Sequence, residues 1–462
     1  MFEANISVNL IKNGYMGIPG IEKISPFEFQ PRFKGLDKHF YAQPPLNVLT
    51  RSIWFKFFGI GLLQQRYLSI FFGLIGLLSW LILLLKLKTE TRTILISLIL
   101  ISTDFIYTRF SAHGRSMDIM CAALAFASWA SYLSFREKNF SIALLVSHIL
   151  IVMSGMTHPN GILGWIGLLF LILYHDHNKL RLKHILISLI PYFIAGVAWG
   201  LYIIQDIDAF YHQFFGNIFG LYYPSYKGVT LQQVRDEIFL RYLFAYGFSD
   251  QFPIYSRILV FILFVYLISY ILLLFFIKNN YQAKVIFSLT TIYILSMTFI
   301  SGRKWPAYLV HIIPLYATCV GILYNQLKEK SLAKNLITFA IIFMILLSSG
   351  VNIWRFKRDE YHKRYLTDIK YLLQILSPQD TIIAPWETSF DIGFDRVLGD
   401  HTLGYFSKMK PDIIVIDPAY ECDFKNFQKN KSEIFDHIQK LLREEYKLVY
   451  EGKLYKIYKK TK

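Results

Sequence analysis

Apolar runs long enough to cross a membrane recur along most of the chain. A helix rises 1.5 Å per residue and needs about 20 apolar residues to span hydrocarbon. Ten runs near this length lie at about 67–85, 93–108, 118–135, 140–155, 161–174, 185–205, 256–277, 285–301, 306–324 and 335–354. The pattern predicts a mainly α-helical polytopic membrane protein, with a transmembrane domain over 67–354.

The segment before the first run is polar overall but contains two amphipathic stretches. Residues 4–12 and 46–58 carry apolar positions at helical spacing, which predicts two short helices lying on the membrane surface. Glycines and prolines separate them and break regular structure. Residues 1–66 are therefore expected to form a loop at the bilayer surface.

After about residue 355 the pattern becomes charged and alternating, which marks a domain boundary. A helix near 360–377 and another at about 430–445 are predicted. Strands are expected at 381–384 and 412–416, and a hairpin with a two-residue turn at Glu451-Gly452. Residues 355–462 are thus predicted to form a small α/β domain.

Lysine and arginine predict the orientation of the chain. The connections on one side of the predicted spans carry thirteen of them, against four in the short connections on the other side. Since basic loops stay in the cytoplasm, residues 1–66, the long loop at about 206–255 and residues 355–462 are expected outside. Exporting 66 polar residues that no apolar segment precedes would need a further helix upstream of Met1, giving eleven spans.

Composition supports the membrane assignment. Charged residues make up 18% of the chain and apolar residues 54%, whereas soluble proteins carry about 25% charged residues. The net charge of +17 comes largely from the inner loops, so nucleic-acid binding is not predicted. The three cysteines are too far apart to indicate a disulfide framework or a thiolate metal site.

Two groups of polar residues lie at the outer ends of predicted spans. Arg115 and Asp118 are three residues apart at the start of the third span and share one helix face. They form either a structural ion pair or a site in which Asp118 acts as a base or metal ligand and Arg115 binds phosphate. Lys304 and Tyr308, preceded by Arg303, form either an interfacial anchor or an anion site.

Other polar residues are expected near the same surface. Glu3 begins the first surface helix, and His39 and Tyr41 precede the second. His158 lies in a short outer loop. For His39 and Tyr41 a role in lining the loop is favoured over catalysis, and His158 is a further, less favoured candidate for lining the same cavity.

These residues occur in an order that resembles the C-type membrane glycosyltransferases, particularly the bacterial relatives of the protein O-mannosyltransferases and of the lipid A aminoarabinose transferase. The shared features are Glu3-Ala4, AsnGlyTyr at 13–15, TyrxxProProLeu at 41–46, PhePheGly at 57–59 before Arg66, ArgSerMetAsp at 115–118 and LysxProxTyr at 304–308. The chain departs from the family pattern at Phe2, where an Asp is expected, and at Gln43, where a basic residue is common.

The resemblance implies transfer of a sugar, with inversion, from a polyprenyl-phosphate donor to a lipid, glycan or protein acceptor. It implies a bacterial plasma membrane and an active site on the outer, periplasmic face. Glu3 and Asp118 would be the catalytic acids, and Lys304 with Tyr308 would hold the donor phosphate. A divalent ion on Glu3 and Asp118 is compatible with this chemistry but not required by it. The alternatives are a flippase for lipid-linked sugars and an inactive member of the family, the latter because of Phe2.

Overall fold

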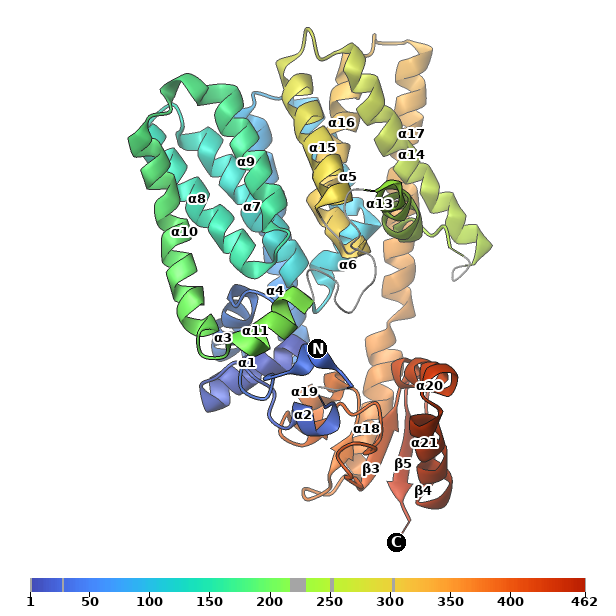
Figure 1. Ribbon diagram of the computed structural model, residues 1–462. Coiled ribbons are helices and arrows are strands. Elements are labelled where there is room, and N and C mark those ends of the chain that lie inside the picture. Colours follow the sequence, from blue (N-terminus) through green and yellow to red (C-terminus); the bar gives the residue numbers. More distant parts are fainter. Residues whose placement is uncertain (1, 27–28, 217–229, 250–252, 301–303, 462) are drawn as a thin grey trace.

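The computed structural model describes residues 2–26, 29–216, 230–249, 253–300 and 304–461, and it has two parts (Figure 1). A bundle of long helices forms one part. A small α/β domain forms the other and lies at the end of the bundle that carries the N-terminal helices. The predicted fold class is confirmed.

The N-terminal surface helices are α1 (Phe2–Asn13), α2 (Ile21–Ile24), η1 (Pro31–Phe33) and α3 (Leu46–Phe58). The bundle comprises α4 (Leu62–Lys86), α5 (Thr91–Thr103), α6 (Phe105–Ala112), α7 (Met117–Phe135), α8 (Phe140–Thr157), α9 (Gly161–Asp176), α10 (Leu182–Ile203), α14 (Val260–Leu272), α15 (Tyr281–Phe299), α16 (Ile313–Gln326) and α17 (Leu332–Arg358). Short connecting helices are η2 (His177–Lys179), α11 (Ile207–Phe210), η3 (Tyr211–Phe215), α13 (Leu231–Asp236), η4 (Glu237–Leu243), η5 (Ile254–Leu259), η6 (Leu273–Phe275) and η7 (Pro306–His311).

Each of the ten predicted runs coincides with helix, but not all of these helices have the length of a full span. Among the described residues, seven helical segments are long and apolar enough to cross a membrane. An eighth results if α5 and α6, which meet at a bend of 58°, count as one. The remaining two are α9, with 16 residues, and α16, with 14 residues after the short η7. The prediction of about ten full spans is therefore too high by this measure, because apolar content does not report how far a helix extends.

Buried polar side chains explain the bend between α5 and α6. The carboxylate of Asp104 accepts hydrogen bonds from the backbone N–H groups of Ile106 and Tyr107, at 2.9 and 3.0 Å, and so caps α6. The hydroxyl of Tyr266 on α14 also donates to it. Capping starts a new helix at this point and redirects the chain.

Helix α7 lies in the centre of the bundle and is buried almost throughout. Its alanines allow close approach of neighbouring helices, as is common in membranes. At Gly164 of α9, a Cβ would overlap Ala125, and the indole N–H of Trp129 donates to the Gly164 carbonyl at 2.9 Å. This tight packing fixes the position of the N-terminal end of α7, where Asp118 lies.

The C-terminal domain joins the bundle through one helical path. Helix α17 contains the boundary predicted near residue 355 and meets η8 (Tyr361–Tyr365) and α18 (Leu366–Ile375) at Asp359. The domain contains η9 (Trp386–Thr388), α19 (Ser389–Ile392), α20 (Pro418–Asn430), α21 (Ser432–Glu444) and strands β1 (Ile382–Ile383), β2 (Val397–Leu398), β3 (Ile413–Ile416), β4 (Tyr446–Glu451) and β5 (Lys456–Lys460). The strand order is β2-β1-β3-β5-β4, with β1, β2 and β3 parallel and β5 antiparallel to both neighbours.

The predicted hairpin forms, but the prediction of a two-residue turn is wrong. Glu451 pairs with Lys456, which leaves a loop over 452–455. The carboxylate of Asp368 on α18 accepts the backbone N–H groups of Leu454 and Tyr455, at 2.8 and 2.9 Å. A Cβ on Gly452 would overlap this carboxylate. The contact with Asp368 therefore stabilises the longer loop and requires glycine at position 452.

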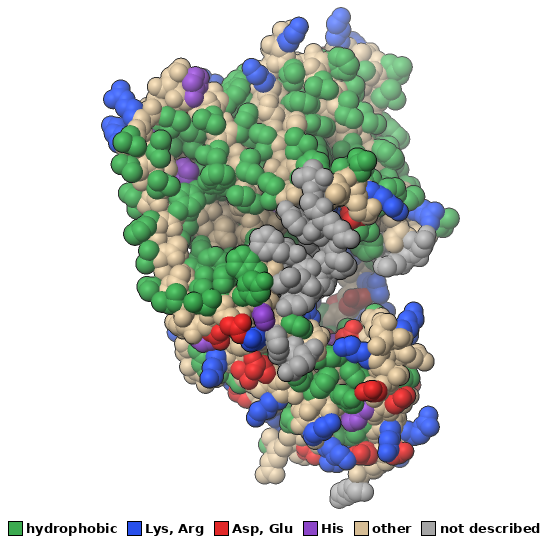
Figure 2. Space-filling view, viewed as in Figure 1, with side chains coloured by type: hydrophobic (Ala, Val, Ile, Leu, Met, Phe, Trp, Pro, Cys, Tyr) green, Lys and Arg blue, Asp and Glu red, His purple; other side chains and the backbone are tan. Residues whose placement is uncertain are grey.

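The kinds of side chain on the surface differ between the helical bundle and the C-terminal domain. Figure 2 shows apolar side chains covering the bundle, with Lys and Arg at its far end, and mixed charges over the C-terminal domain. The exposed apolar residues of α10 and α17 belong to this covering. A bundle with an apolar girdle and basic residues beyond it is what a multipass membrane protein requires.

Candidate active site

Arg115 lies in the loop between α6 and α7, and Asp118 lies at the start of α7, at the end of the bundle nearest the C-terminal domain. Side chains of α4 position the loop, since Ser69 donates to the carbonyl of His113 at 2.5 Å and Gln65 donates to that of Gly114. Asp118 lies in the first turn of α7, where the helix dipole favours an acid. The Arg115 Nε atom is 3.5 Å from Asp118 Oδ2.

Glu3 is connected to the same loop through Arg51, which is buried instead of lying at the membrane surface with the polar side of its helix. The Arg51 guanidinium on α3 is fully buried and lies 3.2 Å from Glu3 Oε2. The same Nη2 atom donates to the Ser116 hydroxyl at 3.2 Å, and that hydroxyl donates to Asn47 Oδ1 at 2.9 Å. These contacts fix both surface helices to the residue two positions before Asp118.

Electrostatics keep Glu3 ionised. Burial by itself would raise the pKa of Glu3, but Arg51, and after it Arg115, lower the pKa below its ordinary value. The Glu3 side chain is 15% exposed and that of Asp118 is 2% exposed, so Glu3 is the more accessible acid.

Arg115 is the residue that joins the predicted groups. Burial lowers its pKa, but Asp118, with Glu3 and Tyr308 after it, raises the pKa above the ordinary value for arginine. Its guanidinium carbon also lies 5.6 Å from the centroid of the Trp305 ring. The two predicted groups, at 115–118 and 304–308, thus meet at one place.

A cluster of charged residues around Lys304 extends the site. Lys304 Nζ is 3.0 Å from Glu237 Oε2, and Glu237 Oε1 is 2.6 Å from Arg241 Nη1. The Arg241 guanidinium carbon lies 5.6 Å from the centroid of the Tyr308 ring. The Tyr308 hydroxyl lies 3.5 Å from His158 Nε2, so His158 joins the group as well.

Glu237 and Arg241 were missed because they fall in the long loop predicted at about 206–255. The structure forms η4 there and places both side chains among the bundle helices, almost fully buried. Their spacing of four residues was the available signal, since it places opposite charges on one helix face. Arg51 carried no such signal, because its partner Glu3 is distant in the sequence.

His39 and Tyr41 lie elsewhere. Their rings stack at a centroid distance of 5.6 Å, and the Tyr41 hydroxyl donates to the carbonyl of Tyr202 at the end of α10. Tyr41 is fully buried, so it packs between the N-terminal loop and α10 instead of lining an open space. Arg303 falls outside the described residues and stays a prediction.

A divalent ion at Glu3 and Asp118 stays a prediction. Within the described ranges, no three His, Cys, Asp or Glu side chains gather as metal ligands would. Glu3 and Asp118 each lie beside an arginine.

Comparison with solved structures identifies the fold of the chain. The chain has the fold of the C-type membrane glycosyltransferases, as the sequence resemblance predicted. Its similarity to ArnT from Cupriavidus metallidurans extends over 99% of this chain and 92% of that one. The TM-score is 0.58 to the apo structure, at 11% identity, and 0.61 to the structure bound to undecaprenyl phosphate, at 12% identity. No family model and no curated protein matches the sequence.

Proposed function

We propose that this protein transfers a sugar from a polyprenyl-phosphate donor to an acceptor hydroxyl at the membrane surface. The observation that carries the proposal is the meeting of Arg115 with Asp118, at 3.5 Å, and with the Trp305 ring, at 5.6 Å, at one end of the bundle. Support comes from the fold, because a structure with the same fold is the complex of ArnT with undecaprenyl phosphate.

The charges of the described site suit a phosphate. Arg115, Arg241 and Lys304 are cations, whereas Asp118 and Glu237 are anions, and Glu3 with Arg51 adds no net charge. The described group therefore carries an excess of one positive charge. A phosphodiester leaving group develops negative charge as its bond to the sugar breaks, and fixed cations stabilise that charge.

Asp118 is proposed as the base. The acceptor hydroxyl attacks the anomeric carbon on the face opposite the phosphate, the carbon–oxygen bond to the phosphate breaks, and the hydroxyl proton passes to the carboxylate. This displacement inverts the anomeric centre. General-base assistance of this kind contributes typically 10²–10⁴-fold.

The structure suggests how donor binding could activate Asp118. Arg115 lies 3.5 Å from Asp118, and the charges of Glu3 and Tyr308 also act on it. A phosphate that binds Arg115 would draw the guanidinium from Asp118 and leave the carboxylate more basic. Glu3 is the weaker candidate base, because buried Arg51 holds its pKa low. Its contacts suit it to positioning the loop that carries Asp118.

A plasma-membrane location with the site on the periplasmic side is part of the proposal. The end of the bundle that carries the site also carries the C-terminal domain, and Arg66 lies 5.8 Å from the Tyr361 ring centroid across that junction. The Lys- and Arg-rich connections lie at the far end (Figure 2). The positive-inside rule places that far end in the cytoplasm.

The test compares wild type with Asp118→Asn in a strain lacking this gene, by mass spectrometry of surface glycans and lipid-linked sugars. We expect wild type to restore one missing sugar and Asp118→Asn to leave it missing while reaching wild-type levels in the membrane. The matched control is Asp436→Asn, which changes an exposed acid on α21 of the C-terminal domain and should restore the sugar. Restoration by Asp118→Asn would remove Asp118 as the base. Redistribution of a lipid-linked sugar across the membrane without glycan change would favour a flippase.

A further inference from the structure

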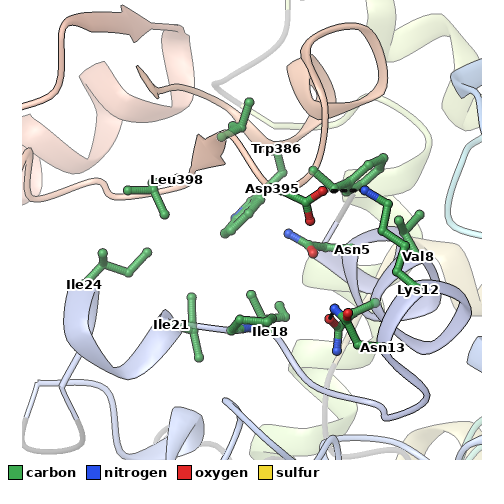
Figure 3. A pocket seen from close by; sticks show the side chains of 14 residues that line it. Asn5, Val8, Lys12, Asn13, Ile18, Ile21, Ile24, Trp386, Asp395 and Leu398 are labelled. Carbon is green, nitrogen blue, oxygen red and sulfur yellow. Dashed lines mark hydrogen bonds and ion pairs between the residues drawn. The ribbon is translucent and has the colours of Figure 1, made fainter. Parts of the chain in front are cut away.

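A cavity of about 280 Å³ lies between the first surface helix and the C-terminal domain, and its lining includes neither Glu3 nor Asp118 (Figure 3). Three segments distant in the sequence line it: α1, residues 18–24 and residues 386–398 of the C-terminal domain. Ligand sites are commonly found at such domain junctions, with volumes of about 300–1,000 Å³. This cavity is at the small end of that range.

One wall of the cavity presents amide side chains at helical spacing. Asn5, Asn9 and Asn13 of α1 are four residues apart and therefore share one helix face. Asn13 donates to Asn9 Oδ1 at 2.6 Å, and Asn9 donates to the Tyr15 carbonyl at 3.0 Å. Asn5 is 5% exposed and faces the cavity in Figure 3. Among the residues that the structure describes, the Asn5 amide makes no hydrogen bond.

The opposite wall is aromatic and rigidly placed. The indole of Trp386 reaches into the cavity and packs directly against Gly399, where any Cβ would overlap the ring. Ile21 and Ile24 lie across from it. The absence of a side chain at Gly399 therefore leaves room for the Trp386 indole.

Charge is balanced in the cavity. Lys12 and Asp395, which link α1 to the C-terminal domain, form an ion pair along its edge. Since the only two charged lining residues neutralise each other, the described lining attracts neither an anion nor a cation.

We propose that this cavity binds a neutral sugar ring of a glycan acceptor. Carboxamides both donate and accept hydrogen bonds, as sugar hydroxyls require. An indole and aliphatic side chains match the apolar C–H face of a pyranose ring. An acyl chain would bury the Asn5 amide without a hydrogen-bond partner, which is unfavourable.

The position on α1 connects this cavity to the proposed reaction. Asn5 follows Glu3 by two residues, and Glu3 is fixed to the loop before Asp118 through Arg51 and Ser116. A glycan held between α1 and the C-terminal domain would therefore be presented beside the active site. The assignment of this sugar as the acceptor rests on the proposed function, whereas the binding of a sugar does not.

The experiment measures binding of neutral saccharides to the full chain in nanodiscs by saturation-transfer NMR. The probes are methyl α-glucopyranoside, methyl α-mannopyranoside, methyl β-galactopyranoside and N-acetylglucosamine. We expect at least one to bind wild type and its Kd to rise tenfold or more in Asn5→Leu and in Trp386→Ala. The matched control is Asn279→Leu, which changes an exposed amide in the connection between α14 and α15 and should leave the Kd unchanged.

Binding of undecaprenyl phosphate, measured on the same preparations, separates this proposal from the proposed function. Unchanged lipid binding with weakened saccharide binding in the two variants supports the cavity. Absence of lipid binding in wild type would count against the donor, while loss of saccharide binding in the variants would still support the cavity. The cavity proposal is overturned if wild type binds none of the four probes, or if both variants bind them as wild type does. Asn5→Leu and Trp386→Ala act on separate walls, so misfolding of one leaves the other decisive.

Discussion

Glu237 offers a sharp test of the phosphate site, because it is the anion that now lies between Lys304 and Arg241. All three side chains are nearly or fully buried. Two unit charges 4 Å apart interact by about 4 kcal/mol at an effective dielectric constant of 20, before desolvation is subtracted. Removing one partner of a buried pair destabilises a protein by about 3–5 kcal/mol. We therefore expect Glu237→Gln to lower the free energy of unfolding by about this amount.

The donor should reverse part of this loss. If Lys304 and Arg241 receive the donor phosphate, the phosphate competes with the Glu237 carboxylate in wild type and has no such competitor in Glu237→Gln. A ligand stabilises the folded state by RT ln(1 + [L]/Kd), so the tighter binder gains more at one lipid concentration. Undecaprenyl phosphate should consequently raise the Tm of Glu237→Gln more than that of wild type.

The assay is thermal unfolding of the detergent-solubilised full chain, with and without undecaprenyl phosphate. The control is Glu360→Gln, because Glu360 also contacts two cations, Arg358 at 2.7 Å and Arg364 at 3.6 Å, but on an exposed surface. Exposed pairs contribute about 0–1 kcal/mol, so its Tm should change little. Equal destabilisation by the two substitutions, or equal lipid stabilisation of wild type and Glu237→Gln, would refute the argument.

Four further outcomes are expected. Arg51→Met should lower the free energy of unfolding by about 3–5 kcal/mol, because it leaves the largely buried Glu3 carboxylate without its cation. A loss below about 1 kcal/mol, measured by thermal unfolding, would contradict this. The pairing of ionised Glu3 stabilises the fold fully above the ordinary pKa of 4.5, and this stability is lost as the pH falls through the lower pKa of the folded state. Glu3→Gln should therefore flatten the acid side of a curve of Tm against pH. An unchanged curve would argue against the pairing. Gly452→Ala should cost about 1–3 kcal/mol through overlap with Asp368. The control is Gly350→Ala, because Gly350 also lacks a positive φ but a Cβ there meets no neighbour within 4 Å, so thermal unfolding should show no loss of stability. Transfer activity should survive chelation of divalent ions, as measured by product formation with and without EDTA, and full loss restored by Mg²⁺ would show that a metal completes the site.

Local pattern was sufficient for much of the fold. Apolar runs, the surface helices at 4–12 and 46–58, and the strands at 381–384 and 412–416 depend on nearby residues, because amphipathicity and chain length decide whether a segment buries a face. The prediction missed β2 and α20, since two-residue strands and helices with little apolar periodicity leave a weak signal.

Residues near each other in the sequence were also enough to indicate part of the site. Arg115 with Asp118, and Lys304 with Tyr308, were recognisable because helical spacing places each pair on one face. The two pairs meet around Arg115 because helix packing brings them together. Sequence spacing could not predict this contact, since about 190 residues separate the pairs.

Tertiary structure alone decided the remaining contacts. Arg51 reaches Glu3, Glu237 reaches Lys304, and Trp386 faces Asn5 only after the surface helices and the C-terminal domain have packed at one end of the bundle. Short-range periodicity determines which face of each helix is buried, but the partner of a buried charge is set by the arrangement of helices. The sequence therefore determined a membrane bundle with acids and cations at its outer surface, and only packing determined which of them lie together.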